Sequence, residues 1–198
     1  MPRRKVRLVA GEYYHVYNRG NNRQDIFFDR ENYWFFLRRL YQYFRVSEGP
    51  HRTLELCTVI AYCLMPNHFH LLLQPRGDQL SRYFQMLAIS YTKAINAHHN
   101  RVGALFQGAF QAKNVDRDEY LLHLSRYIHL NPVHAGLVER PDDWEFSSYR
   151  EYIGTRTITL PKPDIVLAQF PSRDAYRQFV EAHVPYAQER IAHLLFEE

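Results

Sequence analysis

Two spacings of apolar residues follow one another along the chain. Strand-type runs are built from β-branched and aromatic residues and are bounded by turn-forming residues. These runs occupy residues 13–18, 54–64, 68–74 and 105–115. Helix-type runs, with apolar residues three and four positions apart, occupy residues 30–47, 79–98 and 117–130. The predicted order of elements is therefore β-α-β-β-α-β-α.

The first six elements match the split β-α-β arrangement, which predicts an α+β, ferredoxin-like fold with an antiparallel sheet. Its first and third strands lie in the middle of the sheet, and the seventh element is an added helix. After residue 138, prolines separate shorter elements, with helices expected at 172–184 and 186–196. We expect one domain over residues 1–138, beginning with a basic arm over 1–11. Residues 139–198 are too short and interrupted for a core of their own, so we expect a helical C-terminal extension packed on the domain.

The third predicted strand carries two histidines, His68 and His70, directly after a Pro66-Asn67 turn. Side chains alternate across a strand, so both imidazoles should project from one face while Phe69 and its apolar neighbours project from the other. Two imidazoles on one face form half of a site for a divalent metal ion. A single His-x-His pair is also a common incidental feature of strands, so a third ligand is needed.

The last predicted helix of the domain supplies candidates for that ligand and for a nucleophile. Tyr127 and Asn131 are four residues apart and therefore share one helix face. Asn131 offers a carbonyl oxygen to a hard cation, and Tyr127 offers a phenol. When this helix is considered by itself, structural roles explain each residue better: Tyr127 as a core tyrosine, and Asn131 as the residue that ends the helix before Pro132.

Composition bears on the partner. The chain has 198 residues, 46% hydrophobic and 15% aromatic, with a formal net charge of +4. Cations neutralise phosphates and flat rings stack on unpaired bases, so single-stranded nucleic-acid binding fits, as does a basic enzyme with an aromatic core. Cys57 and Cys63 are too far apart on one strand to bridge, which predicts free thiols in a reducing cytoplasm. We expect neither a signal peptide nor a membrane span.

Four segments resemble one family of enzymes, in order, over about residues 12–153. The His-hydrophobic-His signature of the single-tyrosine HUH transposases is similar to residues 63–72, CLMPNHFHLL. Their tyrosine helix and its exit are similar to residues 126–138, RYIHLNPVHAGLV, and their first strand and loop to residues 14–20, YHVYNRG. Residues 144–149, WEFSSY, resemble the segment that follows this helix in REP-associated tyrosine transposases.

The resemblance implies roles for individual residues. His68, His70 and Asn131 match the ligands of Mg²⁺ or Mn²⁺, and Tyr127 matches the nucleophile that forms a 5′-phosphotyrosine link to single-stranded DNA. The implied substrate is a hairpin of a repetitive extragenic palindrome (REP), which the enzyme cleaves and rejoins. Candidate phosphate contacts are Arg19, Arg23, Lys93, Lys113 and Arg126. The family's arginine before the aromatic of the fourth strand is absent here, where the sequence reads Gly108-Ala109-Phe110.

Other readings stay open at this stage. The chain could be a non-catalytic nucleic-acid-binding regulator on the same fold, or a metal-dependent hydrolase that leaves no protein attached to the cut DNA. The long C-terminal extension favours a monomer over the dimers in which related insertion-sequence enzymes exchange tyrosine helices. His15, His129 and His134 lie near the motifs and are expected to be structural.

Overall fold

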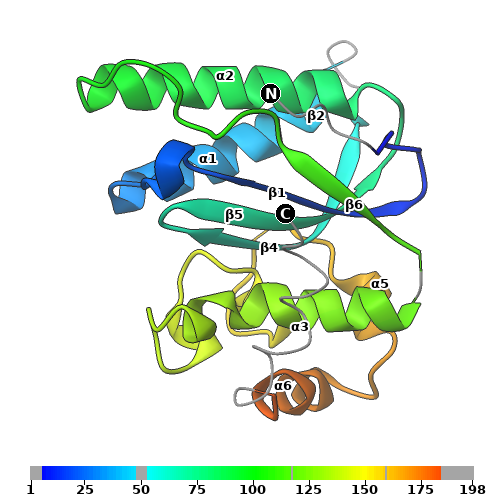
Figure 1. Ribbon diagram of the computed structural model, residues 1–198. Coiled ribbons are helices and arrows are strands. Elements are labelled where there is room, and N and C mark those ends of the chain that lie inside the picture. Colours follow the sequence, from blue (N-terminus) through cyan, green and yellow to red (C-terminus); the bar gives the residue numbers. More distant parts are fainter. Residues whose placement is uncertain (1–5, 48–52, 117, 159, 184–198) are drawn as a thin grey trace.

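The computed structural model describes residues 6–47, 53–116, 118–158 and 160–183. A four-stranded antiparallel sheet forms the centre of the molecule (Figure 1), and its strands lie in the order β4-β5-β1-β6. The bounds of these strands are β1 Tyr13–Arg19, β4 Cys57–Met65, β5 His68–Pro75 and β6 Gln111–Val115. The predicted ferredoxin-like fold is therefore confirmed, with β1 and the histidine strand β5 in the middle.

Helices cover both faces of the sheet (Figure 1). One face carries α1 (Arg30–Tyr43) and α2 (Leu80–His98), and the other carries α3 (Asp118–His134), with α6 (Arg173–Glu181) beyond it. Shorter helical segments are η1 Asn21–Arg23, η2 Pro141–Asp143, α4 Tyr149–Tyr152 and α5 Asp164–Leu167. Within the described ranges, none of the helices combines the length and apolarity that crossing a bilayer requires.

The alternation of side chains divides the core into two. Tyr14, Val16, Phe69, Leu71 and Leu73 project from β1 and β5 into the core under α1 and α2. The opposite face contributes to a second core, which includes apolar residues of α3, α4 and α6. Because successive side chains of a strand point to opposite faces, the histidines of β5 face α3.

The first helix is shorter than predicted. Helix α1 ends at Tyr43, and the expected continuation to residue 47 forms strand β2 (Arg45–Ser47), which pairs with β3 (Thr53–Glu55). Phe44 is fully buried beyond the helix and its carbonyl accepts from the Leu56 amide, which fixes the chain in an extended course. The predicted breaker Gly49-Pro50 lies outside the described residues. The strand predicted over 54–64 is divided between β3 and β4.

Helix α3 is longer than predicted. It continues through Asn131 and Pro132 and ends at His134. Gly136 stops it in the left-handed region, at φ 66°, where glycine is favoured. The Gly136 amide donates to the Val133 carbonyl and the Leu137 amide to the Pro132 carbonyl, which is the Schellman pattern. Pro132 removes a single helical donor, so the cap rather than the proline sets the end.

The fourth strand is also shorter than the predicted 105–115 run. Only Gln111–Val115 pair with β1, and Phe106 forms an isolated bridge to Gly20. Between them, Gly108 adopts φ 124°, a conformation in which only glycine is unstrained. The free, buried state predicted for the thiols of Cys57 and Cys63 is confirmed.

The chain that follows α3 lies along the outer edge of β4. Cys63 and Ser147 form an antiparallel bridge, the Leu64 amide donates to the Phe146 carbonyl, and Trp144 Nε1 donates to the Leu64 carbonyl. Helix α6 begins at Ser172, whose side chain accepts from the Ala175 amide, as expected for an N-cap. The predicted boundary at residue 138 stays a prediction. The helix expected at 186–196 and the first residues of the basic arm lie outside the described residues.

Candidate active site between the central strands and helix α3

The two histidines of β5 face α3 from the middle of the sheet. His70 is 1% exposed, and the ring centroids of His68 and His70 are 5.0 Å apart. Each ring uses Nδ1 for a neighbour: His68 with Asn67 Oδ1 at 2.6 Å, and His70 with His15 Nε2 at 2.9 Å. Nε2 is therefore the nitrogen with which each ring can ligate a cation.

Helix α3 brings Tyr127 and Asn131 to this pair. The Tyr127 ring lies 5.4 Å from the His70 ring, centroid to centroid, in an edge-on arrangement. The Asn131 side chain hydrogen-bonds with both His68 and Tyr127. Its Nδ2 also donates weakly to the Tyr127 carbonyl at 3.4 Å. Tyr127 and Asn131 keep 7% and 8% of their surface exposed, so the site is sheltered but not sealed.

Burial sets the protonation of the site. It lowers the pKa of His68, against the opposing effect of the Asn131 hydrogen bond, and holds the pKa of His70 well below its usual value. Both imidazoles are therefore neutral at pH 7, which is the form that ligates metal ions. Burial also raises the pKa of Tyr127 to about 12, with the Asn131 hydrogen bond acting in the opposite direction. The phenol is thus protonated in the DNA-free protein.

His15 is a member of the site that the sequence prediction left out. It projects from β1 beside His70, its ring is stacked at 5.0 Å between centroids, and it is completely buried. Burial lowers its pKa to about 3, so it is a neutral hydrogen-bond partner for His70. The sequence signal that bears on His15 is the alternation of β1, which places His15 and Tyr17 on one face. The register between β1 and β5, which brings His15 to His70, could not be read from that pattern.

A polar network inside the second core holds α3 in place. His129 is completely buried and uses both ring nitrogens, Nδ1 with the Tyr176 hydroxyl at 2.7 Å and Nε2 with Ser148 Oγ at 2.8 Å. The Tyr176 hydroxyl also donates to Ser125 Oγ, and Ser148 Oγ contacts the backbone of Tyr62 on β4. These bonds connect α3 to α6 and to the edge of the sheet, two residues from Tyr127.

Three of the five predicted phosphate-binding residues lie on the face of the sheet that carries the histidines, or beside the end of β5 at which the histidines lie. Arg19 pairs with His68 in the register of β1 and β5, and its charge lowers the pKa of His68. Lys113, on β6, pairs with His15 of β1, and its charge lowers the pKa of His15. Arg23 is exposed in η1, and its carbonyl accepts from the Asn67 side chain.

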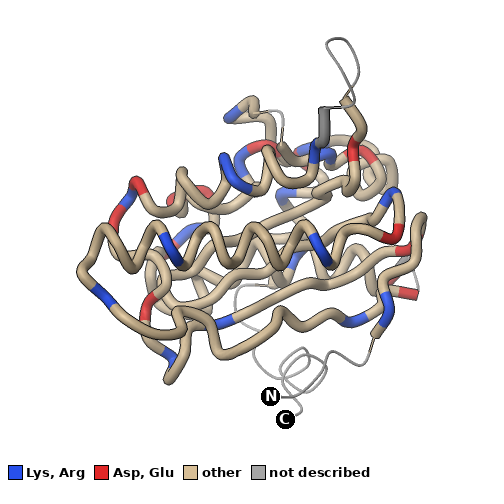
Figure 2. Tube along the Cα trace, turned by 90° about the horizontal axis from the view of Figure 1, so that it is seen from above, with Lys and Arg blue, Asp and Glu red and all other residues tan. Residues whose placement is uncertain are grey.

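The other two cations lie elsewhere. Lys93 is exposed on α2, on the opposite side of the sheet. Arg126 is 6% exposed, with its guanidinium 4.4 Å from the centroid of the Phe179 ring and hydrogen-bonded to His123. It would have to leave Phe179 to reach a phosphate. Figure 2, seen from the α2 side, shows Lys and Arg interspersed with Asp and Glu.

Comparisons with known proteins point to one group. The family model described as "Transposase IS200 like" matches residues 9–131. A curated relative from Haemophilus influenzae, which bears the name REP-associated tyrosine transposase, is 29% identical over 101 residues, 46% of this chain and 57% of the relative. The chain thus spans just over half the length of that relative. A solved structure of the REP-associated tyrosine transposase bound to a REP hairpin covers 82% of this chain and 98% of its own, with a TM-score of 0.62 at 17% identity.

Proposed function

Because the chain belongs to the IS200-like transposase family, we propose that it cleaves and rejoins single-stranded DNA with Tyr127 as the nucleophile. The observation that carries this proposal is the meeting of Tyr127 with His68, His70 and Asn131, from two elements, on one sheltered face. The sequence places these residues about 60 positions apart, and α3 brings them within contact.

The donor set fits a divalent metal ion such as Mg²⁺ or Mn²⁺. Two neutral imidazoles and an amide oxygen form a mixed nitrogen and oxygen site that leaves positions open, unlike a closed structural zinc site with cysteines. His15 and Asn67 hold the Nδ1 atoms, as the outer partners of metal-binding histidines do. When bound, the ion would neutralise negative charge on a non-bridging oxygen of the scissile phosphate.

The phenol oxygen of Tyr127 forms the new bond to phosphorus. The bond from phosphorus to the 3′-oxygen breaks, which leaves a 5′-phosphotyrosine on the protein and a free 3′-hydroxyl on the departing strand. Attack by a second 3′-hydroxyl reverses the step and releases Tyr127. Burial keeps the phenol protonated in the DNA-free protein, so the proton leaves only once DNA and the cation have changed the charge around it.

The proposed substrate is a REP-like DNA hairpin with an adjoining single strand. The structural relative was solved with a REP hairpin, and the curated relative bears the REP-associated name. Arg19, Arg23 and Lys113 are proposed to contact its phosphates, whereas Lys93 lies on the opposite side of the sheet and Arg126 is held against Phe179. Phosphate contacts of this kind position the strand and make affinity depend on salt.

A denaturing gel with a hairpin oligonucleotide labelled at its 3′ end and Mn²⁺ tests the proposal. The 5′-phosphotyrosine link keeps the labelled product on the protein, so wild-type protein should yield a labelled band at protein mass. Tyr127→Phe should lower its yield by at least about 10³-fold, with hairpin binding retained. Tyr120→Phe, which removes another half-buried hydroxyl from α3, is the matched control and should keep the adduct.

The other outcomes separate the alternatives. An undiminished adduct in Tyr127→Phe would refute the assignment of the nucleophile. Cut DNA without attached protein would indicate a metal-dependent hydrolase. Hairpin binding with no cleavage in either Mg²⁺ or Mn²⁺ would indicate a non-catalytic regulator on the same fold.

A further inference from the structure

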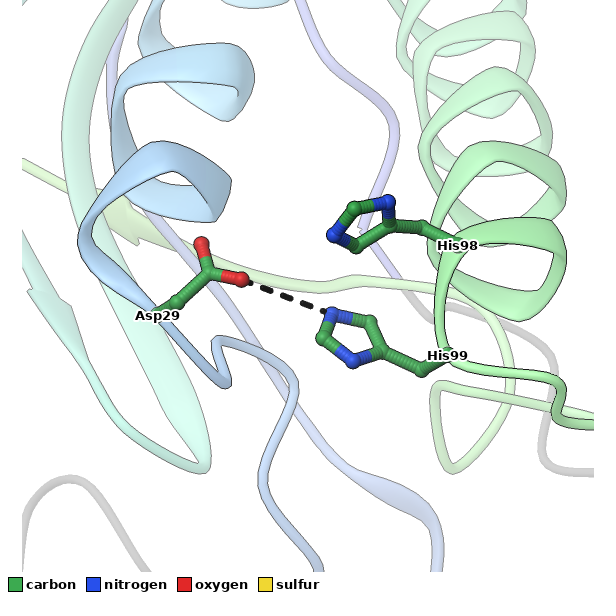
Figure 3. Close-up of side chains that lie close together, drawn as sticks. All are labelled: Asp29, His98 and His99. Carbon is green, nitrogen blue, oxygen red and sulfur yellow. Dashed lines mark ion pairs between the residues drawn. The ribbon is translucent and has the colours of Figure 1, made fainter.

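A second group of metal-ligating side chains lies on the other side of the sheet from His68 and His70. Asp29 stands at the start of α1, and His98 and His99 stand at the end of α2 (Figure 3). Each of the three offers one ligand atom, and these atoms all lie within 4.8 Å of one another. About 70 positions of sequence separate the carboxylate from the imidazoles.

The carboxylate of Asp29 divides its two oxygens between two tasks. Oδ1 accepts from the Asn32 amide at 2.9 Å and so caps α1, while Oδ2 lies 3.7 Å from His99 Nε2. The side chain of Asn32, only 5% exposed, places its Oδ1 3.2 Å from the same His99 nitrogen. Two oxygens from the first turn of α1 thus converge on one imidazole of α2.

An ion pair between Asp29 and His99 accounts for only part of this arrangement. The ring of His98 approaches the same carboxylate (Figure 3), and its centroid is 4.7 Å from that of His99. One cation shared by the carboxylate and both imidazoles would account for the positions of all three side chains.

We propose that Asp29, His98 and His99 bind one divalent transition-metal ion of the Zn²⁺ type, with water or Asn32 Oδ1 completing the coordination. Two imidazoles and one carboxylate are a ligand set that Zn²⁺ binds in proteins, and they leave a position for a further ligand. The ion links the start of α1 to the end of α2. No residue of the tyrosine site takes part, so this site stands independently of the proposed DNA cleavage.

The test counts bound Zn²⁺ on the full chain by equilibrium dialysis with elemental analysis. His98→Ala and Asp29→Asn should each bind one equivalent fewer than wild type. Asn caps a helix as well as Asp does, so Asp29→Asn keeps the start of α1 while it removes the charged ligand. His123→Ala, which deletes a histidine of α3 paired with Glu119, is the matched control and should bind as wild type does. The histidines of the tyrosine site are intact in all four proteins and cancel in the comparison.

Thermal unfolding gives a second measurement that does not depend on stoichiometry. At about a hundredfold excess of Zn²⁺ over its dissociation constant, wild type should melt about 5–10 °C higher than without metal, and the two variants should lose most of that rise. Equal Zn²⁺ content and equal melting shifts in wild type, His98→Ala and Asp29→Asn would overturn the proposal. Metal-free melting curves of the variants show whether they fold.

Discussion

The cores on the two faces of the central sheet differ in residue composition. Under α1 and α2 the core is apolar and aromatic, with the ring of Phe36 in contact with those of Phe27, Phe69 and Tyr91. Under α3 the core includes buried polar groups among its apolar residues. These are His15, His70, Ser125, His129, Asn131 and Ser148.

Because of this difference, we expect the two faces to contribute differently to stability and to the candidate active site. An apolar face gains stability from every side chain it buries, at about 25 cal/mol per Å² of apolar surface. A face with buried imidazoles gives up part of that gain, because each ring must be desolvated and find partners. On the α3 face this desolvation cost accompanies neutral nitrogens and a phenol that are held at fixed positions. We expect the face under α1 and α2 to contribute more stability for each side chain that it buries.

The largest expected effect comes from truncation of the apolar face. Phe36 is fully buried between the rings of Phe27, Phe69 and Tyr91. Phe36→Ala should lower the free energy of unfolding by about 3–5 kcal/mol, because it removes an aromatic side chain and leaves a cavity. Urea denaturation measures the loss.

Adduct formation by the fraction of Phe36→Ala that remains folded should match wild type. Tyr127→Phe is its counterpart on the other face, with adduct lost and unfolding free energy nearly unchanged. A loss below about 1 kcal/mol for Phe36→Ala would contradict the division of labour between the faces.

A smaller effect should appear in the response to acid. Burial lowers the pKa of His129 to about 3, so the folded protein keeps the ring neutral while the unfolded chain protonates it near pH 6.5. The stability that depends on the neutral ring is present above pH 6.5 and is lost as pH falls toward 3. His129 alone should contribute a slope of about 1.4 kcal/mol per pH unit in that window.

His129→Gln tests this contribution, since it keeps a donor and an acceptor for Tyr176 and Ser148 but cannot titrate. Unfolding free energies measured between about pH 6.5 and 4.5 should fall less steeply in the variant than in wild type. Parallel curves would show that His129 is not held neutral by the fold.

The smallest effect concerns the surface charges of the two faces. Arg19→Gln should weaken binding of a single-stranded oligonucleotide a few-fold and reduce the slope of log affinity against log salt by about 0.7. Lys93→Gln removes one charge from the opposite side of the sheet and should change neither. Fluorescence anisotropy over a range of salt measures both. Equal losses would mean that DNA also contacts α2.

Local patterns were sufficient to predict much of the architecture. Alternation over β5 placed His68 and His70 on one face, and the four-residue spacing of Tyr127 and Asn131 placed them on one face of α3. The order of elements predicted the order of the main strands. Each of these depends on geometry within a few residues, which the sequence displays directly.

Contacts between distant segments could not be predicted in the same way. The predicted fold puts β1 beside β5, but the contact between His15 and His70, 55 residues apart, depends on the register of the two strands, which no local pattern displays. Asp29 meets His99 only through the crossing of two helices. The predicted end of α3 at residue 130 is wrong for a local reason, because the left-handed cap at Gly136 ends the helix and Pro132 does not.

The chain that lies along β4 also limits how copies of this protein can associate. On the outer edge of β4, the Tyr62 carbonyl accepts from the Ser148 amide and the Leu64 amide donates to the Phe146 carbonyl. These backbone groups therefore cannot pair with a strand from a second molecule. Within the described residues, β6 pairs with no strand other than β1, so it is the opposite edge strand of this sheet. Addition of a strand from another molecule to the four-stranded sheet would therefore begin at β6, where Lys113 and Asn114 make the edge polar.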